Sequence, residues 1–278
     1  MYVEGVRDGR RFAEALREVA ARKPVVMLKG GRGRTGERAV RSHTASVAGR
    51  REVWRGVLRW AGAVEVETFE ELLDQVVAFT FLPPCAGRRV AVLGGGGGKS
   101  VLSADVWEEE GFELPDLSPS LRERLRERCP GEWDWVGNPV DFSILQERPM
   151  MPEEWLELME ESGDFDFFVF NLTEDDPLPR EVWRFWMEEQ VNGLLRFRGR
   201  GRPLLAVVPS AGLDAGKLSE WRWGDIGELR RRMVEGGVPV FPSPERAARA
   251  LRRFVDYWER RFRRETAWVR PPSCSSGS

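Results

Sequence analysis

Residues 88–111, RRVAVLGGGGGKSVLSADVWEEEG, are the stretch that best predicts the fold. Arg88 to Leu93 predicts a strand. Gly94 to Gly98 predicts a flexible turn, and Ser100 to Gly111 predicts a helix. Strand, turn and helix in this order form the repeating unit of α/β proteins.

The same alternation extends along the chain in both directions. Strands are expected at residues 2–6, 25–28, 64–66, 165–172, 203–208 and 238–241, with a short one at 112–114. Helices are expected at residues 12–19, 54–62, 68–76, 118–125, 153–162, 179–195, 226–236 and 244–263, and a Gly- and Arg-rich loop at 29–41. This alternation predicts parallel sheets with helices on both faces.

Pro83-Pro84-Cys85-Ala86-Gly87 interrupts the pattern. Paired prolines end a helix and stiffen a connection, so we expect a joint between two α/β units there. The expected domains are residues 1–82 and 83–268, followed by a small polar tail at 269–278 that predicts disorder. A length of 278 residues is ample for two such units.

The composition argues against several classes of protein. The net charge is −2, from 43 basic and 45 acidic residues, so no global attraction to nucleic acid or to an anionic membrane is expected. No apolar run reaches the roughly 18 residues of a membrane span. Three scattered cysteines show no metal-ligand spacing and fit a reducing cytosol. We therefore expect a cytoplasmic protein without a metal site.

His43 is the single histidine of the chain, so any neutral-pH imidazole nucleophile must be this residue. It follows the expected loop after a buried strand, at the sheet edge where doubly wound folds bind ligands. Attack on a phosphoryl group requires a carboxylate that orients the other ring nitrogen. Glu4, at the end of the preceding strand, is the candidate. A solvent-exposed loop histidine and a surface glutamate are the alternatives.

The glycine run suggests a phosphate site. Gly98-Lys99-Ser100 fits the end of a Walker A loop, but Leu93 stands where that motif needs its first glycine. A looser site remains, because backbone amides at a helix N-terminus bind phosphate through their N–H groups and the helix dipole. Its candidate residues are Gly95, Gly96, Gly97, Gly98, Lys99 and Ser100. A P-loop-like nucleotide site and a plain flexible turn are the alternatives.

Four further residues are candidates for supporting a site. Ser42 and Thr44 flank His43, and Asn138 and Asp141 lie in the segment Gly137-Asn138-Pro139-Val140-Asp141-Phe142. Asn-Pro is a turn signal, and by local physics alone this segment is a turn and nothing more.

Taken together and in order, these segments resemble the NDP-forming acyl-CoA synthetases, relatives of succinyl-CoA synthetase. Nearly the whole chain takes part, and Ser42-His43-Thr44 with the Lys29-Gly30-Gly31 loop is the most specific element. The other matching segments are Tyr2 to Arg10, Lys23 to Leu28, Ala48-Gly49, Gly62-Ala63-Val64, Gly111 to Ser118, Asn138 to Asp141, Gly237 to Phe241 and Ser243 to Ala247.

The resemblance implies a fold, a reaction and a set of roles. The fold is two flavodoxin-like three-layer units, the first incomplete. The family forms an acyl phosphate from acyl-CoA and phosphate, and passes the phosphoryl group to a histidine and then to ADP on an ATP-grasp domain. His43 matches that histidine, and Glu4 matches the glutamate that steadies it. The Gly94 to Ser100 turn matches a helix N-terminus that cradles the phosphohistidine.

The resemblance also implies partners, and the sequence departs from the family in places. Ala45 replaces the usual glycine, and five glycines precede Lys99 where the family has Asn-x-Gly-Gly-Pro-Gly. CoA, ATP or ADP and Mg²⁺ belong to the complete enzyme, so an ATP-grasp subunit and a CoA-binding domain are the expected partners. A truncated or split protein is expected. A catalytically inactive remnant with a regulatory or scaffold role is the alternative.

Overall fold

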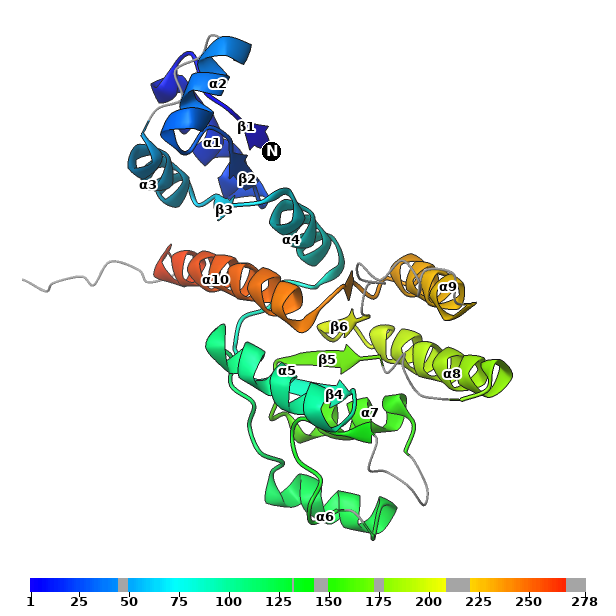
Figure 1. Cartoon of the computed structure of the whole chain (residues 1–278). Helices are drawn as coiled ribbons and strands as arrows, with labels where there is room; N and C mark the ends of the chain where they lie inside the picture. The colour runs from blue at the N-terminus through cyan, green and yellow to red at the C-terminus, as the bar shows by residue number, and fades with distance from the viewer. Residues whose placement is uncertain (45–49, 132, 143–149, 173–177, 209–220, 269–278) are drawn as a thin grey trace, which may run out of the picture. The chain divides into compact units, whose positions relative to one another are not determined.

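The computed structural model describes residues 1–44, 50–131, 133–142, 150–172, 178–208 and 221–268, with the backbone alone at 41–44 and 265–268. The chain forms two compact units, Met1–Thr80 (unit 1) and Phe81–Ser278 (unit 2). Among the described residues, unit 1 contains a parallel sheet of three strands and unit 2 one of four strands. Figure 1 shows the strands and helices of each unit. The predicted α/β class with two parallel sheets is therefore confirmed.

Unit 1 is a three-stranded sheet with the order β1-β2-β3. Its elements are β1 (Tyr2–Val3), α1 (Gly9–Arg22), β2 (Val26–Lys29), α2 (Arg34–Thr44), α3 (Arg51–Ala61), β3 (Val64–Val66) and α4 (Phe69–Phe81), the last of which ends at the first residue of unit 2. Leu16 of α1, Met27 of β2 and Leu58 of α3 share one apolar core, so the two helices cover one face of the sheet. Asp8 caps α1 by accepting a hydrogen bond from the Arg11 N–H at 3.0 Å.

Unit 2 is a four-stranded parallel sheet with the order β4-β5-β6-β7. Its elements are β4 (Val90–Gly94), α5 (Gly97–Glu109), α6 (Pro119–Arg128), α7 (Pro152–Ser162), β5 (Phe167–Asn171), α8 (Arg180–Arg198), β6 (Leu204–Val207), α9 (Trp221–Glu235), β7 (Val240–Phe241) and α10 (Pro244–Trp268). None of the described helices combines the length and apolarity of a membrane span.

The two faces of the unit 2 sheet are covered by different helices. Phe168 and Phe170 of β5 join the large core that includes residues of α7, α8 and α9. Because side chains alternate along a strand, Phe167 and Val169 face the other way, and both are fully buried. Helices α5 and α10 contact each other apart from that core. The result is a three-layer unit, as expected for a parallel sheet buried on both sides.

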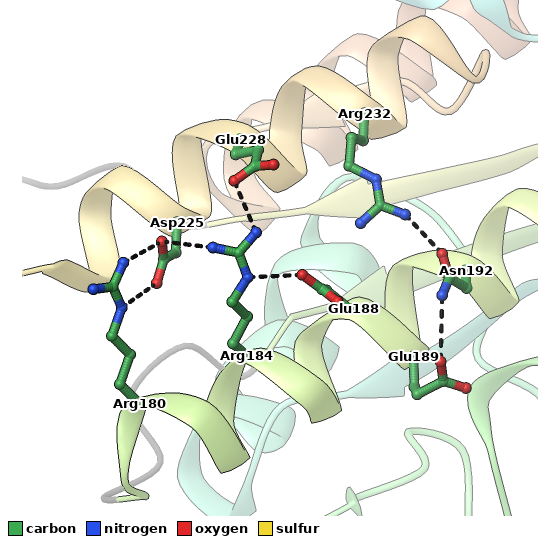
Figure 2. Close-up of polar contacts among 8 residues, drawn as sticks. All are labelled: Arg180, Arg184, Glu188, Glu189, Asn192, Asp225, Glu228 and Arg232. Carbon is green, nitrogen blue, oxygen red and sulfur yellow. Dashed lines mark hydrogen bonds and ion pairs between the residues drawn. The ribbon is translucent and has the colours of Figure 1, made fainter.

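An ion network joins α8 to α9 (Figure 2). The Asp225 carboxylate is buried and accepts two hydrogen bonds from Arg180, each at 3.0 Å, and one from Arg184 at 3.5 Å. Arg184 also pairs with Glu188 and with Glu228 of α9. Exposed ion pairs add little stability, so the buried Asp225 is the member expected to matter most.

Three local predictions were wrong. Most of the expected loop at residues 29–41 is helical, because α2 spans Arg34–Thr44. The glycine turn is shorter than predicted, since α5 already begins at Gly97. Residues 112–114 form no strand, and Glu113 makes one isolated parallel bridge to Arg89. In the first two cases, glycines, which have low helix propensity, lie in the first turn of α2 or α5. Most of the backbone N–H groups in a first turn have no helical partner.

Candidate functional site

Glu4 lies at the carboxyl edge of the unit 1 sheet, directly after β1. Its Oε1 accepts a hydrogen bond from the Tyr2 hydroxyl at 3.1 Å, and its carbonyl oxygen accepts one from Lys29 Nζ at 2.8 Å. The Tyr2 ring lies against Gly30, where any side chain would collide with it. Burial and the neighbouring Glu4 carboxylate raise the pKa of the Tyr2 hydroxyl, which therefore stays a donor to Glu4.

Lys29 is a functional candidate to which the sequence assigned no role of its own, although it begins the Lys29-Gly30-Gly31 loop. It ends β2 at the same sheet edge, and only 3% of it is exposed. Its Nζ donates to the carbonyl oxygens of Glu4 and Gly30 and lies 5.3 Å from the centroid of the Trp54 ring. Desolvation lowers the Lys29 pKa, and the charges of Glu37 and Glu4 oppose that shift. The sequence feature that points to it is a lysine placed directly after the wholly apolar run Val25 to Leu28.

His43 lies in the last turn of α2 together with Ser42 and Thr44. Arg34 begins this helix after β2, so a rise of 1.5 Å per residue puts the His43 backbone about 13 Å further along the helix axis. The side chains of Ser42, His43 and Thr44 lie outside the described residues. The predicted hydrogen bond between Glu4 and His43 therefore stays a prediction.

The glycine turn of unit 2 joins β4 to α5. Gly94 has a φ of +78°, and a Cβ there would collide with the Asn171 carbonyl group on β5. Gly96 is the N-cap of α5 and supplies no side chain for capping. Gly95 is buried, whereas Gly97, Gly98 and Lys99 are exposed in the first turn of the helix. The exposed first turn of α5 thus lies at a helix N-terminus, the kind of position that stabilises an anion, but the N–H groups of Gly95, Gly97, Lys99 and Ser100 already donate to acceptors within the chain.

Ser100 faces inward rather than toward this exposed turn. It is buried, and its hydroxyl donates to the Gly94 carbonyl oxygen at 3.4 Å. A P-loop would offer this hydroxyl to magnesium, whereas here it contacts the backbone of the turn.

The segment around Asn138 and Asp141 supports the same turn from the outer side of β4. Asn138 donates to the carbonyl oxygens of Val90 and Pro115 and accepts from the Val92 N–H, so its amide continues the sheet beside β4. Asp141 Oδ2 accepts from the Gly97 N–H at 2.7 Å. A carboxylate therefore caps α5 from 44 residues away, in place of a local N-cap side chain.

A separate cavity of about 390 Å³ opens at the opposite, amino edge of the unit 2 sheet. Its lining includes Cys85, Arg89, Phe168 and Asp166, and Arg89 makes two side-chain hydrogen bonds to Asp166. Burial, together with the charge of Asp166, raises the pKa of the Cys85 thiol to about 11. The cavity contains none of the predicted site residues. Among the described residues, no group of three or more His, Cys, Asp or Glu side chains is arranged to hold a metal ion.

Comparison with known proteins relates the chain to acyl-CoA ligases. Residues 1–79 match the family model of the succinyl-CoA ligase like flavodoxin domain. Over 253 residues the chain is 39% identical to the alpha subunit of ADP-forming acetate–CoA ligase II of Pyrococcus furiosus, covering 90% of this chain and 51% of that subunit. The resemblance to the ADP-forming acyl-CoA synthetases is confirmed. The alpha subunit of ligase I from the same organism is 29% identical over 251 residues, covering 90% of this chain and 50% of that subunit.

A solved structure shares the fold. It is the dinucleotide-forming acetyl-coenzyme A synthetase 1 of Ca. Korarchaeum cryptofilum in complex with phosphate and ADP, with a TM-score of 0.69 and 22% identity. The similarity covers 97% of this chain and 55% of that one. The chain therefore spans about half the length of these relatives.

Proposed function

We propose that this chain relays a phosphoryl group through His43 during ADP-forming acyl-CoA ligation. The observation that carries the proposal is the similarity, over 90% of the chain, to alpha subunits of ADP-forming acetate–CoA ligases. Within that similarity, Ser42-His43-Thr44 matches the family's phosphohistidine segment. The substrate class is an acyl-CoA, equivalently a carboxylic acid with CoA.

The relay consists of two displacements. An imidazole nitrogen of His43 attacks the phosphorus of an acyl phosphate, the bond from phosphorus to the acyl oxygen breaks, and the carboxylate leaves. A terminal phosphate oxygen of ADP then attacks the same phosphorus, the P–N bond breaks, and ATP forms. Glu4 is assigned the role of orienting the imidazole, and the contact from Tyr2 restrains the Glu4 carboxylate.

Unit 2 is assigned the stabilisation of the phosphohistidine. The residues for this role are Gly95, Gly96, Gly97, Gly98, Lys99 and Ser100, which surround the start of α5. The positive end of the helix favours a dianionic phosphoryl group beside its exposed first turn, Gly97 to Lys99. Asp141 already accepts from the Gly97 N–H, so its part is to hold the turn in shape. Asn138 does not contact the turn itself; its hydrogen bonds to Val90 and Val92 hold the segment that carries Asp141 against β4.

The complete reaction requires sites beyond those assigned to this chain. CoA, ADP or ATP and Mg²⁺ are the expected small molecules, held by a CoA-binding domain and an ATP-grasp subunit. The phosphohistidine segment is assigned to a domain at residues 1–82, and the phosphate-binding turn to a domain at residues 83–268. A cytoplasmic location agrees with a substrate set of nucleotides and CoA thioesters.

Reconstitution tests the proposal. The chain is combined with candidate ATP-grasp and CoA-binding partners, and ATP formation from acetyl-CoA, ADP and phosphate is measured. We expect ATP formation that is lost with His43→Asn and strongly reduced with Glu4→Gln. Glu52→Gln, an exposed glutamate in the first turn of α3, is the control and should leave the rate unchanged. Equal, measurable rates with the His43→Asn chain would show that the relay does not use His43, whereas no ATP formation by the unaltered chain with competent partners would favour the inactive alternative.

A further inference from the structure

Lys29 is a buried cation at the unit 1 sheet edge. It follows Val26, Met27 and Leu28, and all four residues of β2 are buried. Burial of an ammonium group is unfavourable unless polar groups replace its water, and a leucine or methionine would pack here without that cost. The presence of a charge at this position therefore calls for an explanation beyond packing.

The contacts of Lys29 join two segments that matter for the proposed relay. One acceptor is the carbonyl oxygen of Glu4, at 2.8 Å, and the other is the carbonyl oxygen of Gly30. The first belongs to the residue proposed to orient His43, and the second to the turn that leads into α2. A single ammonium group thus fixes the backbone of Glu4 relative to the chain that enters the His43 helix.

The charge of Lys29 also affects this edge. Among the residues whose side chains are described, no carboxylate lies within 4.0 Å of its Nζ, and two carbonyl dipoles and the Trp54 ring surround it instead. Carbonyl oxygens and an aromatic face favour an ammonium ion. The ammonium ion therefore places a positive charge at the edge that carries Glu4, where the charges of Glu37 and Glu4 favour its protonated form.

We propose that Lys29 is a positioning residue for phosphoryl transfer: it holds the Glu4 backbone in place and supplies positive charge at the edge where the phosphoryl group is transferred. This inference rests on the proposed function of His43. A purely structural role for Lys29 would make its removal affect stability and leave transfer unchanged.

Labelling of His43 from ATP with an ATP-grasp partner tests the inference, with Lys29→Met, Lys29→Arg and Lys23→Met compared at equal fractions folded. Lys23 is exposed at the end of α1 and is the matched control. For Lys29→Met we expect a labelling rate about 10- to 100-fold lower, because small misplacements at a reacting centre have effects of this size. The KM for ATP should be unchanged, and Lys29→Arg should recover most of the rate. A Lys29→Met chain that labels at the rate of Lys23→Met would overturn the inference.

Amide hydrogen exchange separates this inference from the proposed function. If the unaltered chain acquires no label with a competent partner, the relay itself is wrong. Exchange at Gly30, whose N–H donates to the Val3 carbonyl oxygen at 3.0 Å, then tests the positioning claim, since loss of the Lys29 contacts should speed exchange there by roughly tenfold or more, with little change in the cores of either unit. Unchanged exchange at Gly30 in Lys29→Met would overturn the claim without reference to catalysis.

Discussion

Replacement of Gly94 by alanine is expected to destabilise unit 2 by about 2–5 kcal/mol. A φ of +78° costs a residue with a Cβ about 1–2 kcal/mol relative to glycine. The added Cβ would also collide with the Asn171 carbonyl oxygen and lie 3.2 Å from its carbon. Because those atoms belong to the neighbouring strand β5, relief requires the β4–β5 pair to shift, and such overpacking costs about 1–3 kcal/mol more.

Gly98→Ala is the matched control for Gly94→Ala. Gly98 lies in the first turn of α5 with no atom within 4 Å of its added Cβ, so alanine there should stabilise the helix by about 0.5–1 kcal/mol. Urea unfolding of both variants, followed by tryptophan fluorescence, measures the difference. A Gly94→Ala chain as stable as the Gly98→Ala chain would refute the claim that Gly94 is required by the approach of β5.

Three further outcomes follow from the contacts of unit 2. Asp225→Ala should lower the free energy of unfolding by about 1–3 kcal/mol, because it removes a buried acceptor from Arg180, and urea unfolding measures the loss. Asp141→Ala should cost about 0.5–2 kcal/mol, because the Gly97 N–H loses its capping acceptor, and amide exchange at the start of α5 reports it. The Cys85 thiol, with a pKa of about 11, should react with iodoacetamide slowly at pH 8, at a rate that rises up to about pH 11.

Each of these outcomes has a result that contradicts it. Asp225→Ala with unchanged stability would mean that the network of Figure 2 contributes nothing measurable. Unaltered exchange at Gly97 in Asp141→Ala would mean that another acceptor caps the helix. For Cys85, peptide mass spectrometry follows its alkylation apart from that of Cys129 and Cys274. A rate that levels off near pH 9 would show that burial does not raise the pKa.

The order of strands and helices was predictable because it depends on local patterns. The segment Arg88 to Leu93 predicted β4, and Ser118 predicted the start of α6, where its hydroxyl indeed accepts from the Leu121 N–H. Such signals lie within a few residues of the element they define.

The β2–α2 connection was not predictable in the same way. Its glycines predicted a loop, whereas Gly31 and Gly36 pack against each other and Gly31 also packs against Val40 of α2. Here glycine permits close approach of backbone to helix, and sequence alone does not distinguish this use from flexibility.

The candidate sites depend on contacts between distant residues. Asp141 was a turn residue by local pattern, and its role became visible when the fold placed it 2.7 Å from the Gly97 N–H. Lys29 lies 25 residues from Glu4, and the hydrogen bond from its Nζ to the Glu4 carbonyl oxygen could not be inferred from the local pattern. Long-range pairs of this kind require the three-dimensional arrangement of the sheet edge.

The central claim is that His43 carries the phosphoryl group, and direct localisation of that group is its strictest test. The chain is incubated with radiolabelled ATP and an ATP-grasp partner of demonstrated competence, and the label is mapped by peptide mass spectrometry at neutral pH. The account predicts acid-labile phosphate on His43 that is absent from His43→Asn and is removed by ADP. No label, or label on another residue that persists in His43→Asn, would contradict it.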